Sequence, residues 1–113
     1  MKPHEKSDAA ALYTIRERCS TILERIRGKL MPDFMADPAL QDSVALQLML
    51  IGEEVKKLSP GAKGRFPNLE WNNMARLRDK ITHHYNKIDL LQVWEIATEN
   101  ILSLLEALAS EKI

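Results

Sequence analysis

The residues best suited to chemistry in this chain lie in the segment 78–85, which reads RDKITHHY. Arg78 carries a permanent cation, and a planar guanidinium can form paired hydrogen bonds with phosphate. His83 can take or give a proton near neutral pH, because the unperturbed pKa of histidine is about 6.5. Tyr85 adds a hydroxyl that can donate, accept or be modified. We interpret the spacing Arg-x-x-x-x-His-x-Tyr as a candidate site for cleaving phosphodiesters.

The charge of the chain is balanced overall but uneven along its length. The 113 residues include 16 basic and 16 acidic side chains, which argues against a general coat for nucleic acid. Residues 56–87, however, hold eight basic and two acidic side chains, a net charge of +6. This cationic block surrounds the segment 78–85. The local excess favours an anionic ligand there, although helix surfaces also commonly carry Lys and Arg.

Cysteine usage and hydropathy limit the class of protein. The single cysteine, Cys19, excludes an intramolecular disulfide and lies in an apolar-periodic stretch, so we predict a buried small hydrophobe in a reducing compartment. No Cys/His cluster has zinc spacing, and we predict neither a metal nor a cofactor. The first residues form no signal peptide, and no stretch approaches the roughly 18–20 apolar residues of a membrane span. We expect a cytoplasmic protein that does not bind membranes.

Apolar residues recur at three- and four-residue steps in four segments, the signature of helices with one apolar face. No segment alternates with a period of two, so strands are not expected. The predicted fold class is all-α, an antiparallel four-helix bundle in a single domain 1–113 with a core over about 8–108. The predicted helices span about 8–30, 37–58, 68 to 84–86, and 89–108.

Local signals fix the ends of these helices. Asp37 and Asp89 are expected to cap the free amides of the second and fourth helices, and Pro38 suits a first helical position. The segments 31–33 and 59–61 contain proline and are predicted to break the chain between helices. The second helix is apolar on more than one face, because Leu46, Met49 and Leu50 add to its main stripe. That pattern predicts a second interface as well as the core.

Helical geometry constrains how the motif can work. Each residue turns about 100°, so Tyr85 shares a face with Arg78 while His83 lies about 140° away from it. A straight helix would not point Arg78 and His83 at one phosphate. Either the helix loosens near its end, or the site is composite across a dimer. His84 competes with His83 for the catalytic role.

The chain resembles the HepT-like family, formerly DUF86, within the HEPN superfamily. The resemblance covers about residues 10–108. Its most specific element is the Arg-x-x-x-x-His-x-Tyr motif, and the polar Asp79 after the arginine suits the superfamily pattern. The segments that carry the resemblance are 43–58 with Ile51-Gly52-Glu53-Glu54, then Trp71, 78–85, Ile88-Asp89 and Val93-Trp94.

The resemblance implies a function. Members of the family are metal-independent ribonuclease toxins of toxin–antitoxin pairs that work as homodimers. Their partner is a nucleotidyltransferase-fold antitoxin of the MNT type, which transfers AMP to the motif tyrosine. By resemblance, Arg78 and His83 are the catalytic pair acting on tRNA or mRNA, and Tyr85 is the adenylylation target. Asp79, Lys80, His84 and Glu53 are expected to support the site or contact RNA.

Two other functions remain open at this point. The chain could be a non-catalytic HEPN module that binds RNA, nucleotide or the nucleotidyltransferase without cutting, or a purely structural bundle. Trp71 and Trp94 could stack on bases, but their helical spacing is more typical of core or dimer contacts. Of Glu53 and Glu54, one could pair with an arginine, and at least one is expected on a solvated face.

Overall fold

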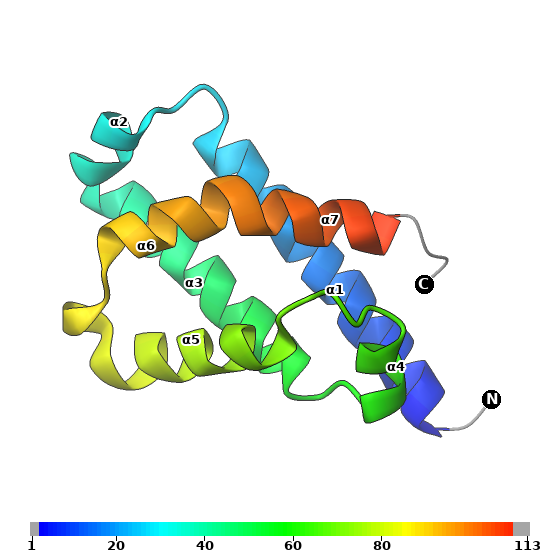
Figure 1. Ribbon diagram of the computed structural model, residues 1–113. Coiled ribbons are helices and arrows are strands. Elements are labelled where there is room, and N and C mark those ends of the chain that lie inside the picture. The colour runs from blue at the N-terminus through cyan, green and yellow to red at the C-terminus, as the bar shows by residue number, and fades with distance from the viewer. Residues whose placement is uncertain (1–2, 110–113) are drawn as a thin grey trace.

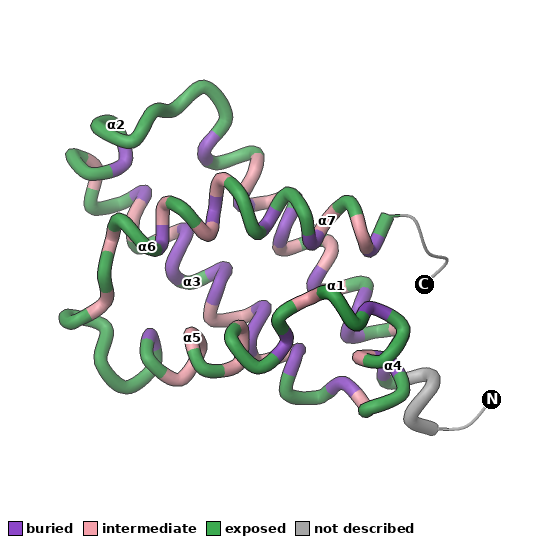
Figure 2. Tube along the Cα trace, in the orientation of Figure 1, coloured by how far each residue is buried: buried purple, intermediate pink, exposed green. Residues whose placement is uncertain are grey.

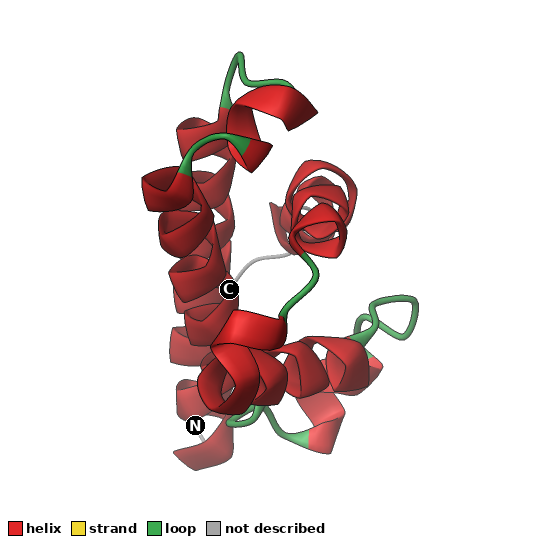
Figure 3. Cartoon of the chain, turned by 90° about the vertical axis from the view of Figure 1, so that its left-hand side faces the viewer, coloured by secondary structure: helices red, strands yellow, loops and turns green. Residues whose placement is uncertain are grey.

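The computed structural model describes residues 3–109, with side chains described from Ser7 onward. Within that range every regular element is helical and there is no strand, which confirms the all-α prediction (Figures 1 and 3). The elements are α1 (Pro3–Ile26), α2 (Met31–Met35), α3 (Pro38–Val55), α4 (Pro60–Gly64), α5 (Trp71–His84), the 3₁₀ turn η1 (Tyr85–Lys87), α6 (Leu90–Glu95), the π-helical segment η2 (Ile96–Asn100) and α7 (Ile101–Ala109).

The predicted caps form at the starts of the later helices. Asp37 Oδ1 accepts a hydrogen bond from the Leu40 amide at 3.1 Å, with Pro38 in the first turn. Asp89 Oδ1 accepts from the Leu91 amide at 3.0 Å and also from the Gln92 amide. Each cap satisfies amides that the helix itself leaves unpaired. Both capping predictions are therefore confirmed.

The structure corrects the prediction in the connecting segments. The first helix ends at Ile26, four residues early, and Gly28 follows with a φ of 73°, a conformation that favours glycine. The segment 31–33 does not only break the chain. It begins the short helix α2, because proline suits a first turn and Asp33 Oδ2 accepts from the Leu30 amide at 2.8 Å.

The segment 59–61 likewise starts a helix as well as ending one. Ser59 Oγ accepts from the Ala62 amide at 3.2 Å, and Pro60 opens the short helix α4. The fourth predicted helix is interrupted by η2, where the side chain of Thr98 donates to the Trp94 carbonyl at 2.9 Å. Hydroxyl side chains that bond to a preceding carbonyl loosen the regular ladder.

The long helix α3 is the centre of the packing. It packs against α1 on one side and α5 on the other, and α7 packs against α1 (Figure 1). The facing sides of these helices carry the buried residues (Figure 2). Cys19 is fully buried there, and burial raises the pKa of its thiol to about 12. The prediction of a buried hydrophobe at Cys19 is confirmed.

Both tryptophans contribute to packing. Trp71 is buried, its Nε1 donates to the Lys63 carbonyl at 3.2 Å, and its ring meets Phe66 edge to face. Trp94 is partly buried, with its ring 5.3 Å from Phe34, so it fastens α2 to α6. These contacts favour the packing interpretation of both residues over base stacking. No helix in the range 3–109 is both long and apolar enough to cross a bilayer.

A buried carboxylate ties α1 to the junction of α3 and α4. Asp8 is only 6% exposed; its Oδ1 accepts from the Ser59 amide at 2.9 Å and its Oδ2 from the Ser59 hydroxyl at 2.6 Å. Hydrogen bonds to a charged group each contribute about 1.5–3 kcal/mol. Ser59 also caps α4, so this one contact orients three helices.

We predict that Asp8→Ala lowers the free energy of unfolding by about 2–3 kcal/mol, because the partly buried amide and hydroxyl of Ser59 lose their acceptor. Urea titration followed by circular dichroism measures the change. The control is Ser7→Ala at the exposed neighbouring position, which should change stability by less than about 0.5 kcal/mol. Equal effects of the two substitutions would contradict the structural role of Asp8.

Candidate functional site

A glycine in the middle of α3 sets the distance between α3 and α5. Gly52 is buried, and a Cβ added to it would lie 2.9 Å from the Met74 carbonyl oxygen and well inside contact distance of the Arg78 Cβ. A glycine in a helix interior costs about 1 kcal/mol relative to alanine. Here it permits the close crossing that brings the motif arginine against α3.

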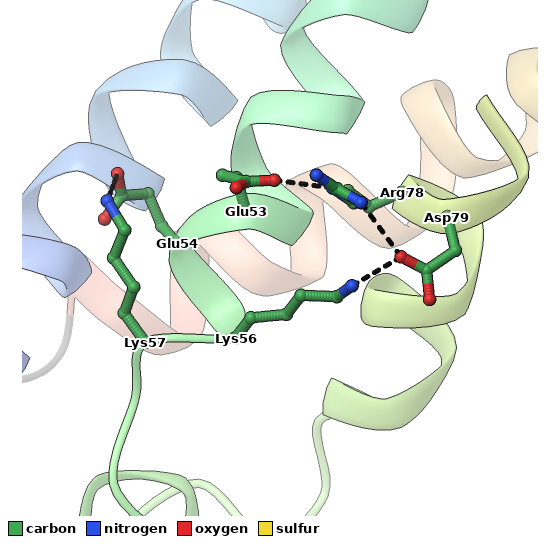
Figure 4. A network of polar contacts seen from close by, with 6 residues as sticks. All are labelled: Glu53, Glu54, Lys56, Lys57, Arg78 and Asp79. Atoms are coloured by element: carbon green, nitrogen blue, oxygen red, sulfur yellow. Dashed lines mark hydrogen bonds and ion pairs between the residues drawn. The ribbon is translucent and has the colours of Figure 1, made fainter. Parts of the chain in front are cut away.

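Arg78 is held by carboxylates from two helices (Figure 4). Its Nε donates to Glu53 Oε2 at 2.5 Å, and its Nη1 donates to Asp79 Oδ1 at 3.1 Å. The side chain of Lys56 forms an ion pair with the same Asp79 oxygen. These hydrogen bonds occupy two of the five guanidinium N–H donors. About a fifth of the Arg78 side chain is exposed, so it can still meet a ligand.

The electrostatics of this network favour the charged forms of Arg78 and Asp79. The hydrogen bonds to Glu53 and then to Asp79 raise the pKa of Arg78 above its ordinary value. The hydrogen bond from Lys56, with a smaller contribution from Arg78, lowers the pKa of Asp79 below its ordinary value. The network therefore persists at neutral pH and presents a fixed cation at the surface.

Tyr85 is the first residue of η1, directly after α5, and it points back to the start of α3. Its hydroxyl donates a hydrogen bond to Asp42 Oδ1. Burial, and then the hydrogen bond to this carboxylate, raise the pKa of Tyr85 to about 12. The side chain is 41% exposed, so the hydroxyl lies at the protein surface. The motif tyrosine is thus a neutral phenol paired with a carboxylate.

The two histidines lie at the exposed end of α5. His83 and His84 are both exposed, and His84, the last residue of α5, departs from helical dihedrals with a φ of −140° and a ψ of 43°. Helical geometry places His83 about 140° from Arg78 around the axis. The helix does not loosen between the two residues. The irregular backbone at His84 follows His83 and therefore does not bring the Arg78 and His83 side chains of one protomer together.

A groove runs along the other side of α5. It has a volume of about 780 Å³ and lies between α5 and the α6–η2–α7 segment. Lys80 and Arg76 line it from α5, and Glu95 and Glu99 line it from the opposite side. Lys80 is exposed and faces this groove, apart from the Arg78 network. Among residues 3–109, no group of three or more His, Cys, Asp or Glu side chains is placed to hold a metal ion.

The structure brings some predicted site residues together and separates others. Glu53 and Asp79 contact Arg78 directly, while Lys80, His83 and His84 do not join that network in the described part of the chain. Glu54 pairs instead with Lys57 at 3.1 Å.

Three residues at the site were not predicted from the sequence to belong to it. Gly52 carried a usable signal, since an isolated glycine in an apolar helix often marks a close approach. Lys56 lies three residues after Glu53, so the two share a helical face. Asp42 carried no local signal, because its contact with Tyr85 joins residues 43 positions apart.

The described elements are all helical, and Arg78 lies in a charged cluster at their surface. Both features fit the class of helical ribonucleases that the sequence motif indicates. The family described as "Ribonuclease HepT-like" matches residues 15–111. The chain therefore belongs to the HepT-like family, and the resemblance inferred from its motif is confirmed.

Named relatives cover most of this chain. "Probable ribonuclease HepT" of Thermococcus cleftensis is 34% identical over 100 residues, covering 88% of this chain and 91% of that protein. "Putative RNase MJ0127" of Methanocaldococcus jannaschii is 34% identical over 97 residues, covering 86% of this chain and 80% of that protein. A third, "Putative RNase TTE0752" of Caldanaerobacter subterraneus, is 30% identical over 96 residues, covering 85% and 86%. No solved structure matches the chain.

We predict that Gly52→Ala destabilises the protein by about 1–2 kcal/mol, although alanine favours helix. The added methyl group forces α5 away from α3, and overpacking of this kind costs about 1–3 kcal/mol. Urea unfolding measures the effect. The matched control is Gly64→Ala in α4, where an added Cβ meets nothing within 4 Å. That substitution should be neutral or stabilising by up to about 1 kcal/mol. A Gly52→Ala protein as stable as the wild type would refute the close-crossing argument.

Proposed function

We propose that this protein is a metal-independent ribonuclease and the toxin of a cytoplasmic HepT/MNT toxin–antitoxin pair. In this proposal two HEPN-type bundles form a homodimer, and Arg78 and His83 cut RNA. Membership in a family of ribonucleases supports the reaction class. The observation that carries the assignment to this site is the surface guanidinium of Arg78, held in place by Glu53 and Asp79.

The proposed reaction uses the 2′-hydroxyl of the RNA as its nucleophile. That hydroxyl attacks the adjacent phosphorus, the bond to the 5′-oxygen breaks, and a 2′,3′-cyclic phosphate forms. His83 removes or delivers a proton, a role typically worth about 10²–10⁴-fold in rate. Arg78 stabilises the negative charge that grows on the phosphoryl oxygens. Glu53 and Asp79 keep the guanidinium oriented, so little reorganisation is needed when the phosphate arrives.

A dimer explains how Arg78 and His83 can act on one phosphate. The α3 edge beside the motif carries Asp42, Leu46, Leu50 and Glu53, which recur at three- and four-residue steps. Asp42 contacts Tyr85 and Glu53 contacts Arg78, so Leu46 lies on the edge between them. Leu46 is a large apolar residue that remains 48% exposed. We propose that a second protomer covers this edge and brings its own His83 to Arg78.

The proposed regulation acts on Tyr85. An MNT-type nucleotidyltransferase would transfer AMP to the Tyr85 hydroxyl, which is partly exposed at the surface. Because Tyr85 lies two residues after His83, the attached phosphodiester would place a negative charge beside the proposed catalytic histidine and obstruct the approach of an RNA phosphate. Lys80 and His84 would contact RNA beyond the scissile bond.

The second candidate is a non-catalytic module that binds RNA, nucleotide or the nucleotidyltransferase. Two carboxylates already surround Arg78. Five residues of helix place the His83 of the same protomer about 140° away around the axis of α5. An isolated protomer with this arrangement would bind an anion more readily than it would cut one. The two candidates differ in whether RNA is cleaved at all.

We predict that the purified protein cleaves tRNA or mRNA in EDTA and that His83→Ala lowers the rate at least about 100-fold. DNA of the same sequence should resist cleavage, since it lacks the 2′-hydroxyl. Gel analysis of 5′-labelled RNA measures both effects, and the intact mass is checked first so that modified Tyr85 is not mistaken for inactivity. Thr82→Ala, at an exposed position of α5 to which the proposal gives no role, is the matched control and should leave the rate unchanged. No cleavage by unmodified wild-type protein would favour the non-catalytic module.

We predict that mixing Arg78→Ala and His83→Ala proteins restores cleavage. If each site takes its arginine and histidine from different protomers, a mixed dimer holds one intact site and one empty site. Random exchange makes about half of the dimers mixed, so the mixture should recover about a quarter of wild-type activity. Unfolding and refolding the two proteins together ensures exchange. No recovery in a mixture shown by mass to contain mixed dimers would place both residues of a site in one protomer.

A further inference from the structure

The hydrogen bond between Tyr85 and Asp42 joins a nucleophilic side chain to a carboxylate that no other part of the proposed mechanism uses. The phenol donates to Asp42 Oδ1 across 43 residues of sequence. Asp42 belongs to the first turns of α3 and is exposed in the single protomer. No ion pair with Asp42 is found among the side chains described from Ser7 onward. Its carboxylate is therefore available to the phenol.

We propose that Asp42 is the general base for modification of Tyr85 and removes the phenolic proton as the hydroxyl attacks phosphorus. The inference rests on the proposed adenylylation of Tyr85. With a nucleoside triphosphate as donor, a bond forms between the Tyr85 oxygen and the α-phosphorus. The bond from that phosphorus to the bridging oxygen breaks, and pyrophosphate leaves. The proton passes to the Asp42 carboxylate and then to water.

The state of Tyr85 makes such a base necessary. Burial, and then the hydrogen bond to Asp42, raise the pKa of Tyr85 to about 12, so the free phenolate is disfavoured at neutral pH. The hydroxyl must therefore lose its proton during the attack rather than before it. A base within hydrogen-bond reach of the nucleophile meets the geometric requirement for this role. Modification also replaces the hydroxyl that donates to Asp42 with a negatively charged phosphodiester. The modified Tyr85 side chain must therefore move away from the Asp42 carboxylate.

The chain contains its own control for this chemistry. Tyr13 in α1 is 52% exposed, slightly more than the 41% of Tyr85. The guanidinium of Arg16 lies 5.5 Å from the centre of the Tyr13 ring, and no hydrogen bond to a carboxylate is found for it in the described structure. Exposure alone would make Tyr13 the more reactive phenol. A base at Tyr85 predicts the reverse order.

The test uses adenosine 5′-phosphorimidazolide, an activated AMP donor that reacts without a transferase and releases imidazole. Unmodified wild-type protein, Asp42→Asn and Asp42→Glu are incubated with the reagent, and peptide mass spectrometry follows AMP on Tyr85 and Tyr13. We expect Tyr85 to react at least about tenfold faster than Tyr13 in the wild type. In Asp42→Asn, which keeps an acceptor oxygen but cannot take the proton, Tyr85 should slow to within about twofold of Tyr13. Asp42→Glu should restore part of the difference.

The outcomes separate this inference from the proposed function. Equal labelling of the two tyrosines in the wild type, or rapid labelling of Tyr85 in Asp42→Asn, would overturn the role of Asp42. So would an Asp42→Glu protein no faster than Asp42→Asn. An unchanged Tyr13 rate shows in each variant that the fold is intact. RNA cleavage is measured on the same wild-type preparation, so loss of the ribonuclease proposal would be seen independently of Tyr85 labelling.

Discussion

The close crossing of α3 and α5 at Gly52 is the constraint on which the candidate site depends. Because no side chain separates the helices there, the backbone of α5 lies near enough for Arg78 to reach Glu53. Asp79 then comes within reach of Lys56, the residue that directly follows α3. The positions of four charged side chains thus follow from the absence of one methyl group. Protein interiors transmit such small changes in volume because they are closely packed.

The charges around Arg78 balance one another before any ligand arrives. Two cations, Arg78 and Lys56, meet two carboxylates, Glu53 and Asp79. The pairs are partly exposed, so they contribute modestly to stability and mainly fix geometry. An arginine held in this way loses little conformational freedom on meeting phosphate. The Tyr85–Asp42 pair lies on the same edge of α3, and it brings a hydroxyl rather than a cation to the surface.

The sequence predicts the long helices and the identity of the motif residues, but not how those residues meet. Apolar periodicity and the caps at Asp37 and Asp89 locate α3 and the last helix, because these signals act within a few residues. The short helices α2 and α4 were missed, since proline both ends one helix and starts the next. The interruption at η2 was also missed, because its apolar spacing still fits a continuous helix.

The contacts of the site likewise divide into those that the sequence predicts and those that it does not. Asp79 lies next to Arg78 in sequence, and a pairing of Arg78 with a glutamate was a natural expectation. The partner of Tyr85 was not, because Asp42 is 43 residues away and its turn of α3 shows nothing unusual. The separation of Arg78 from His83 follows from helical geometry alone, and the continuous α5 bears it out. Contacts between residues far apart in sequence can be identified only once the tertiary arrangement is known. Contacts between sequence neighbours and the angular positions of residues around a helix can be predicted without it.

The order of the helices also has a consequence for synthesis on the ribosome. Every partner of Arg78 and Tyr85 named above lies between Asp42 and Asp79, and all of these residues are translated before α7. The surface of α1 that α7 covers stays exposed until α7 has been synthesised. Contacts between nearby segments require less loop closure and form sooner. A nascent chain therefore assembles its arginine network while its hydrophobic core is still open.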